Sequence, residues 1–309
     1  MHDNSGPGEA MSGEFTFIDW IRGQTRPNTR VLIGPGDDCA ALSPGRSPWL
    51  ITTDMLMDGT DFVLAEVGPH RVGLKAMAVN LSDLAAMAGR PVGVVVSVAL
   101  PRGDDTLGRD LYHGLREMAD SFGVPIVGGD TNSWAGPLVI SVTAFGEAER
   151  PVRRNGAKPG DWLFVTGPLG GSILGHHLDF TPRIAEALRL HETVDLHAMI
   201  DISDGLSADL HHILEESRCG AVLHAEAIPI AEAARQLTQQ SSKTPLEHAL
   251  GDGEDFELVF AVSPEDGEKL LREPPVQVWK IGECVADGYW IEEQKNRRPL
   301  VPTGWVHSL

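Results

Sequence analysis

Basic residues are scarce in this sequence of 309 residues, because 25 Lys and Arg stand against 44 Asp and Glu and give a formal net charge of −19. Such a charge repels the phosphates of nucleic acids and of anionic membranes, so neither is an expected partner. Long apolar runs are also missing. The most apolar stretch, at 91–101, is far shorter than the roughly 18 residues of a membrane-spanning helix and is typical of a buried strand.

Cysteine is rare as well. The three cysteines, Cys39, Cys219 and Cys284, lie far apart and have no C-x-x-C spacing. This pattern argues against a disulfide framework or a zinc knuckle and predicts small packed side chains. Residues 1–13 lack the basic start and apolar core of a secretory signal. We therefore expect a disordered leader and a cytoplasmic protein.

Motifs of several common enzyme classes are missing too. The sequence has no G-x-x-x-x-G-K-[ST] loop, no protein-kinase signature and no G-x-G-x-x-G after a predicted strand, which disfavours the common nucleotide-binding folds. It has neither a G-x-S-x-G elbow nor an H-E-x-x-H motif, so nucleophilic and zinc catalysis are not expected. The histidine pairs at 176–177 and 211–212 are interpreted as structural or surface residues.

Hydrophobic spacing and turn residues divide the chain into two halves. The spacing predicts helices over 70–89, 105–122 and 183–196, and strands over 49–55, 92–100, 138–145, 161–166, 221–225 and 256–262. A short apolar run at 124–127 is expected to break at Gly128, Gly129 and Asp130. The basic, Pro- and Gly-containing stretch 150–160 predicts a boundary between domains at 14–150 and 151–309. Because helices and strands do not alternate regularly, the expected fold is α+β with mixed or antiparallel sheets.

Carboxylates recur at the ends of predicted elements or inside apolar stretches. They are Asp37 with Asp38, Asp54, Asp83, Asp130, and Asp201 with Asp204. Taken singly, each can be a turn residue or a helix cap. Asp83 is different, because it lies in an apolar helix where a carboxylate is costly unless it is paired or bound to a cation.

If these groups converge, the ligands are all oxygen atoms, with the hydroxyls of Thr52, Thr53 and Ser203 beside them. Such a set favours Mg²⁺, as in sites of phosphoryl transfer. Nearby Gly-rich turns could bring backbone N–H groups to phosphate oxygens, although each turn alone is weak evidence. Arg153 and Arg154 are the best basic candidates for a nucleotide phosphate, and solvated charges at the domain boundary are the alternative.

The order of motifs resembles that of the thiamine-monophosphate kinase family, in the superfamily that includes aminoimidazole ribonucleotide synthetase. The motifs are GEFTFIDWI at 13–21, GPGDDCAAL at 34–42, TTDMLMDGTDF at 52–62, KAMAVNLSDLAAMAGRP at 75–91, GGDT at 128–131, NGAKPGDW at 155–162, DISDGLSADLHHI at 201–213 and GEDFELVF at 253–260. The resemblance covers nearly everything after the leader. The combination of VNLSDLAAM, D-x-S-D-G and G-E-D-[FY]-E-L is much more specific than the shared Gly-Asp-Asp turn.

This resemblance implies a two-domain α+β fold whose first sheet joins that of a second subunit, and therefore a homodimer. It also implies ATP-dependent phosphorylation of thiamine monophosphate to thiamine diphosphate. The Mg²⁺ ligands that it implies are Asp38, Thr52, Thr53, Asp54, Asp83, Asp130, Asp201 and Asp204. The ATP positions that it implies are Tyr112, Gly129, Asp130, Arg154 and Ser203, and the substrate positions are Asp61, Glu254 and Trp305. An indole is a suitable surface for stacking a cationic thiazolium ring.

The chain departs from the family pattern at three places. Asp61 stands where the family often has histidine, Ser133 replaces an arginine of the GGDTTRG pattern, and the stretch 175–183 lacks a helical insertion. A histidine could meet a phosphate directly, whereas an aspartate would need a metal ion. These departures bear on substrate selectivity more than on the type of reaction.

The expected mechanism is direct in-line transfer with Mg²⁺ and no covalent enzyme intermediate. Since the acceptor is already an anionic phosphate, no strong general base is required, and catalysis consists mainly of positioning and charge neutralisation. Two alternatives stay open at this point. One is another enzyme of the same superfamily, and the other is a non-catalytic protein that binds nucleotides or thiamine phosphates.

Overall fold

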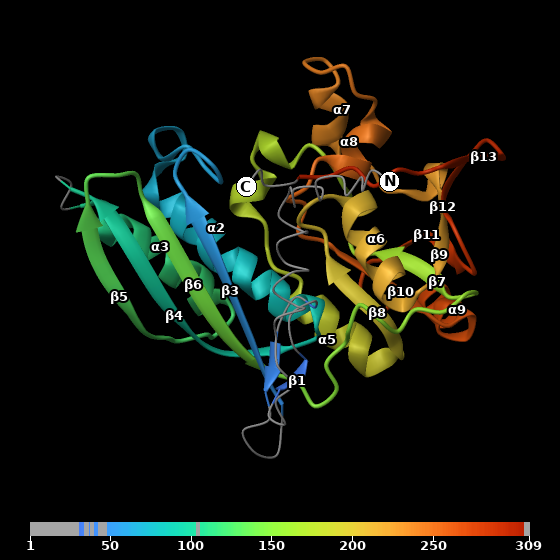
Figure 1. The fold of residues 1–309 in the computed structure, drawn as a ribbon, viewed down its shortest axis with the longest axis horizontal. Coiled ribbons are helices and arrows are strands. Elements are labelled where there is room, and N and C mark those ends of the chain that lie inside the picture. Colours follow the sequence, from blue (N-terminus) through green and yellow to red (C-terminus); the bar gives the residue numbers. More distant parts are fainter. Residues whose placement is uncertain (1–30, 34–36, 38–39, 43–47, 103–105, 306–309) are drawn as a thin grey trace, which may run out of the picture.

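The computed structural model describes residues 31–33, 37, 40–42, 48–102 and 106–305 (Figure 1). The predicted leader at 1–13, Asp38 and Cys39 lie outside these residues. The described chain forms two sheets with helices between and around them, so the prediction of an α+β fold with mixed sheets is confirmed. No helix in this part of the chain is both long and apolar enough to cross a membrane.

The first sheet contains six strands in the order β1-β2-β3-β6-β4-β5. The elements of this half are β1 (Val31–Ile33), β2 (Ala40–Leu42), β3 (Trp49–Met57), α2 (Leu64–Ala86), β4 (Arg90–Pro101), α3 (Leu107–Ser121), β5 (Ile126–Trp134) and β6 (Val139–Glu147). Only β4 and β5 pair in parallel, and the other neighbours are antiparallel. Helices α2 and α3 cover one face of the sheet (Figure 1).

The second sheet contains seven strands in the order β13-β12-β9-β11-β7-β10-β8. Its strands are β7 (Trp162–Val165), β8 (Leu196–Asp201), β9 (Gly220–His224), β10 (Leu258–Val262), β11 (Trp279–Val285), β12 (Tyr289–Glu293) and β13 (Asn296–Pro299). The helices of this half are η1 (Ser172–Leu174), α4 (His176–Asp179), α5 (Ile184–Thr193), α6 (Leu206–Ser217), η2 (Ala225–Ala227), α7 (Glu232–Leu237), α8 (Pro245–Gly251) and α9 (Pro264–Arg272). Here β12 and β9 form the parallel pair.

Helix α2 lies between the two halves and contacts elements of both (Figure 1). One side packs against β3, β6 and α3, and another side meets α4, α5 and β8. Backbone packing against α3 is close, because a Cβ atom added to Gly114 would lie 1.9 Å from the carbonyl oxygen of His70. Enclosed in this way, α2 buries polar side chains as well as apolar ones, and these polar groups require partners inside the protein.

Two predicted boundaries differ from the structure. The expected break at Gly128, Gly129 and Asp130 does not occur, because β5 continues through these residues along β4. The predicted helix 183–196 ends as α5 at Thr193, and Leu196 instead begins β8, where it pairs with Val262. In both cases, pairing with a neighbouring strand decides a conformation that the local sequence leaves ambiguous.

Candidate functional site

The end of α2 is bonded to strand β3 of the first sheet. The hydroxyl of Thr52 donates a hydrogen bond to the Asp83 carboxylate. The backbone N–H of Asp54 donates to the amide oxygen of Asn80 at 3.2 Å, while Asn80 donates from its own amide nitrogen to the Ala76 carbonyl. These bonds join the strand that carries Asp54 to the helix that carries Asp83.

The same part of α2 is bonded to the second sheet. Ser82 donates to Oδ2 of Asp201 at 2.5 Å, and Asp201 ends β8 with only 2% of its surface exposed. A continuous chain of contacts therefore runs from Asp54 through α2 to Asp201. We call Asp54, Asp83, Asp201 and Asp204 the central carboxylates.

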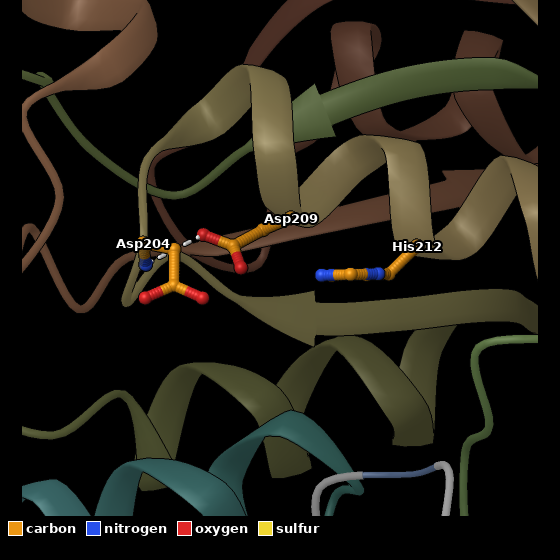
Figure 2. A group of neighbouring side chains, drawn as sticks. All are labelled: Asp204, Asp209 and His212. Atoms are coloured by element: carbon orange, nitrogen blue, oxygen red, sulfur yellow. Dashed lines mark hydrogen bonds between the residues drawn. The ribbon is translucent and has the colours of Figure 1, made fainter. Parts of the chain in front are cut away.

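Asp204 lies in the turn between β8 and α6, and Figure 2 shows it beside Asp209 and His212. Oδ2 of Asp209 accepts hydrogen bonds from the backbone N–H groups of Asp204 at 3.0 Å and Gly205 at 2.9 Å. One ligand atom from each of Asp204, Asp209 and His212 lies within 4.8 Å of the others. Burial, with the nearby charges of Asp204 and Asp201, raises the pKa of Asp209 well above its ordinary value.

Sequence reasoning missed Asp209. Its signal was available, since an acid in the first turn of a helix beginning after Gly205 can accept the unpaired N–H groups of that turn. Of the donors predicted for a metal, Thr52, Asp54, Asp83 and Asp201 are linked through α2, and Asp204 follows Asp201 in the same turn. The central carboxylates and the Thr52 hydroxyl supply hard oxygen atoms, and this donor chemistry fits Mg²⁺.

The predicted substrate residues lie near the same turn. The indole of Trp305 is 56% exposed, and its backbone N–H donates to the Asp204 carbonyl oxygen at 3.1 Å. The backbone N–H of Glu254 donates to the carbonyl oxygen of Ser203, one of the predicted nucleotide positions, at 2.7 Å. Asp61 uses its carboxylate within its own turn, where it accepts from the Met57 N–H at 2.7 Å. The aspartate found in place of the family's histidine therefore has a local structural contact.

Other predicted residues stand apart from the central carboxylates. Asp130 is exposed on β5, and the register runs from Asp130 through Ser97 and Ser141 to Met55. Three strand spacings of about 4.8 Å separate Asp130 from β3 by roughly 14 Å. A Mg²⁺ ion about 2.1 Å from its ligands cannot bind Asp130 and Asp54 together.

Two further predicted nucleotide positions, Tyr112 and Gly129, lie on α3 and β5 of the first half. Tyr112 is exposed on α3, and the backbone of Gly129 approaches β4 so closely that an added Cβ would lie 1.9 Å from the Val96 oxygen. The backbone N–H of Arg154 donates to Asp37 at 2.9 Å, which joins the predicted domain boundary to the Gly-Asp-Asp turn. Thr53 faces the opposite side of the sheet from Thr52 and contacts Thr143. Asp38 lies outside the described residues.

Comparisons with known proteins match the chain to one family. Models of the AIR synthase related protein family match residues 36–148 with the N-terminal domain and 158–290 with the C-terminal domain. The chain is 44% identical to the thiamine-monophosphate kinase of Rhodopirellula baltica, over 96% of this chain and 97% of that protein.

Solved structures of thiamine-monophosphate kinases have the same fold. AaThiL complexed with AMPPCP and TMP superposes with a TM-score of 0.84 at 29% identity, covering 96% of this chain and 97% of that one. The thiamine-monophosphate kinase of Stenotrophomonas maltophilia superposes with a TM-score of 0.71 at 33% identity, covering 91% and 97%. Since the motifs, the two-sheet fold and the full-length similarity coincide, the chain belongs to the thiamine-monophosphate kinase family.

Proposed function

We propose that this protein transfers the γ-phosphoryl group of ATP to the phosphate of thiamine monophosphate, giving thiamine diphosphate and ADP. The observation that carries the proposal is the meeting of the central carboxylates with Glu254 and Trp305 around the turn after β8. The family relationship and the AaThiL structure with an ATP analogue and TMP support the same reaction.

In this proposal Mg²⁺ ions are held by Asp38, Thr52, Asp54, Asp83, Asp130, Asp201 and Asp204. The Thr53 side chain, also predicted as a ligand, faces the other side of the sheet and does not share an ion with the Thr52 hydroxyl. When bound, it supplies positive charge to phosphate oxygens in a chain whose own net charge is −19. Because Asp130 lies roughly 14 Å from β3 by strand spacing, it serves a different ion or phosphate from Asp54. Asp83 and Asp201 are oriented by the hydroxyls of Thr52 and Ser82.

The protein's own groups act mainly by positioning both substrates. ATP lies along Tyr112, Gly129, Asp130, Arg154 and Ser203, so that its triphosphate extends toward the central carboxylates. Thiamine monophosphate lies at Asp61, Glu254 and Trp305, with its cationic ring on the indole. The acceptor is already anionic, so direct in-line transfer needs no covalent enzyme intermediate and no strong base.

The second face of the first sheet supports a homodimer. That face bears Met55, which is 61% exposed, together with exposed Trp49 and Met57. Apolar side chains gathered on an open sheet face mark a site of protein association. We assign dimerisation and nucleotide binding to a domain at 14–150, place the second domain at 151–309, and infer a cytoplasmic location. The substitution Met55→Glu should shift the mass in solution toward the monomer, as measured by light scattering.

The test of the reaction is ADP release from ATP and Mg²⁺, with thiamine diphosphate identified as the product. Thiamine monophosphate is compared with thiamine, hydroxymethylpyrimidine phosphate and formylglycinamidine ribonucleotide. We expect turnover with thiamine monophosphate alone. Turnover only with another acceptor would make the protein a sister enzyme, and binding without turnover would make it a non-catalytic binding protein.

A further inference from the structure

Lys75 on α2 is a charged residue with almost no access to solvent, and neither the sequence motifs nor the reaction gave it a role. Its side chain is 1% exposed. The ammonium contacts Oε1 of Glu254 at 2.5 Å and donates a hydrogen bond to the Asp61 carbonyl oxygen at 2.7 Å. A buried ammonium is costly to desolvate, so its presence requires partners that are themselves held in place.

Both of these partners belong to the proposed acceptor site, and they come from different halves of the chain. Asp61 lies in the loop between β3 and α2, whereas Glu254 lies in the turn between α8 and β10. One ammonium therefore fixes the position of each relative to the other. The Glu254 side chain is 36% exposed, so it contacts the buried ammonium and still reaches the surface where a ligand arrives.

The turn that carries Glu254 is strained and firmly anchored. Glu254 has φ of 53°, a left-handed conformation that is unfavourable for a residue with a side chain. The turn is held by hydrogen bonds from the N–H groups of Glu254 and Phe256 to Ser203 and Ile202, and from the Ser172 hydroxyl to Gly253. Strain that is maintained by so many contacts is typical of a functional segment, because it aims a side chain in one direction.

We propose that Lys75 is a positioning residue for the phosphorylated acceptor, acting through Glu254 and the Asp61 loop rather than through ATP. This inference rests on the proposed function. In this inference Lys75 raises the affinity for thiamine monophosphate in two ways. Its ammonium fixes the position of the Glu254 carboxylate, and it offsets the negative charge of that carboxylate beside an anionic substrate. A purely structural ion pair would change stability without changing the ratio of the two substrate constants.

The test compares Lys75→Met with wild type in steady-state kinetics and in equilibrium binding of thiamine monophosphate without ATP. Because Lys75 fixes the Glu254 carboxylate, we expect KM and Kd for thiamine monophosphate to rise by about tenfold or more in Lys75→Met, which corresponds to about 1.4 kcal/mol of binding free energy. KM for ATP should change by less than about twofold. Lys75→Arg keeps the charge and should recover part of the lost affinity.

A double-mutant cycle tests the route of the effect. If Lys75 acts through Glu254, Lys75→Met should have much less effect on KM for thiamine monophosphate in a Glu254→Gln background than in wild type. The matched control is Arg71→Met, one helical turn earlier on α2. It removes a more exposed ion pair to Asp179, also across the two halves, and should leave both KM values unchanged.

The outcomes separate this inference from the proposed function. If wild-type protein makes no thiamine diphosphate, the function and its acceptor are both overturned. If wild type is active and Lys75→Met keeps its KM for thiamine monophosphate, or raises KM for ATP equally, only the positioning role is overturned. Should Lys75→Met fail to fold, Lys75→Gln, whose amide can still donate to Asp61, is judged by the same two constants.

Discussion

Ser82 on α2 donates a 2.5 Å hydrogen bond to Asp201 at the end of β8, and this bond joins α2 to the second sheet beside the proposed metal site. Ser82→Ala leaves the buried Asp201 without that donor. We expect the free energy of unfolding to fall by about 1–3 kcal/mol, as measured by chemical denaturation. Ser121→Ala on α3 removes an exposed serine and should cost less than about 0.5 kcal/mol. Equal stability of the two variants would contradict the role given to Ser82.

Asp83→Asn and Asp204→Asn should each lower kcat by about two to three orders of magnitude, because each removes a charge that the proposed reaction requires. Circular dichroism should show an intact fold in both variants. Asp110→Asn, on the exposed side of α3, is the matched control and should keep normal turnover. Near wild-type activity in both variants would rule out the metal assignment.

Asp209 should act by holding the turn at Asp204 through hydrogen bonds. Two substitutions distinguish this role from that of a negatively charged metal ligand. Asp209→Asn keeps an oxygen that can accept from the N–H groups of Asp204 and Gly205, whereas Asp209→Ala does not. We expect Asp209→Ala to need several times more Mg²⁺ for half-maximal activity, and Asp209→Asn to behave like wild type. If the asparagine variant needs as much Mg²⁺ as the alanine variant, the charge of Asp209 matters directly.

His177 should make stability depend on pH. Burial lowers the pKa of His177, whose Nδ1–H donates to the Ser172 carbonyl oxygen at 2.8 Å. As pH falls below about 6.5, the unfolded chain binds a proton at His177 that the folded chain resists, so this residue's contribution to stability is lost. The loss is at most about 1.4 kcal/mol per pH unit. Denaturation of His177→Asn from about pH 7 to about pH 5 should show a shallower decline than wild type. Identical declines would exclude His177 as the cause.

Local sequence predicted the parts of this protein that depend on local chemistry. The apolar spacing around Asp83 indicated a buried helix, and a carboxylate in that helix pointed to an internal partner, which the structure supplies as Thr52. The mixed sheets also followed from the irregular order of elements. Both results rest on hydrophobic spacing and on the high cost of burying a charge.

Contacts between distant segments were beyond such reasoning. Glu254 lies 179 positions after Lys75 in the sequence, and neither residue type identifies the other as its partner. Similarly, Gly128 and Gly129 favour a break when considered alone, yet strand β4 supplies the hydrogen bonds that extend β5 through them. The contribution of Asp209 could have been inferred from its place in the first turn of α6, but only once the start of that helix was known.

Side chains of α2 contact both halves of the chain, so the number of residues between these side chains matters. Lys75 and Ser82 are seven positions apart, which is almost two full turns, and both reach the second half of the chain at Glu254 and Asp201. Asn80 and Asp83 lie on another side of the helix from Lys75 and Ser82, and they contact β3. Inserting one residue between Lys75 and Asn80 would turn everything after it by about 100° and advance it by about 1.5 Å. The proposed acceptor end at Lys75 and the proposed metal end at Asp83 would then no longer face their partners together, so the number of residues in α2 sets the distance between these two ends.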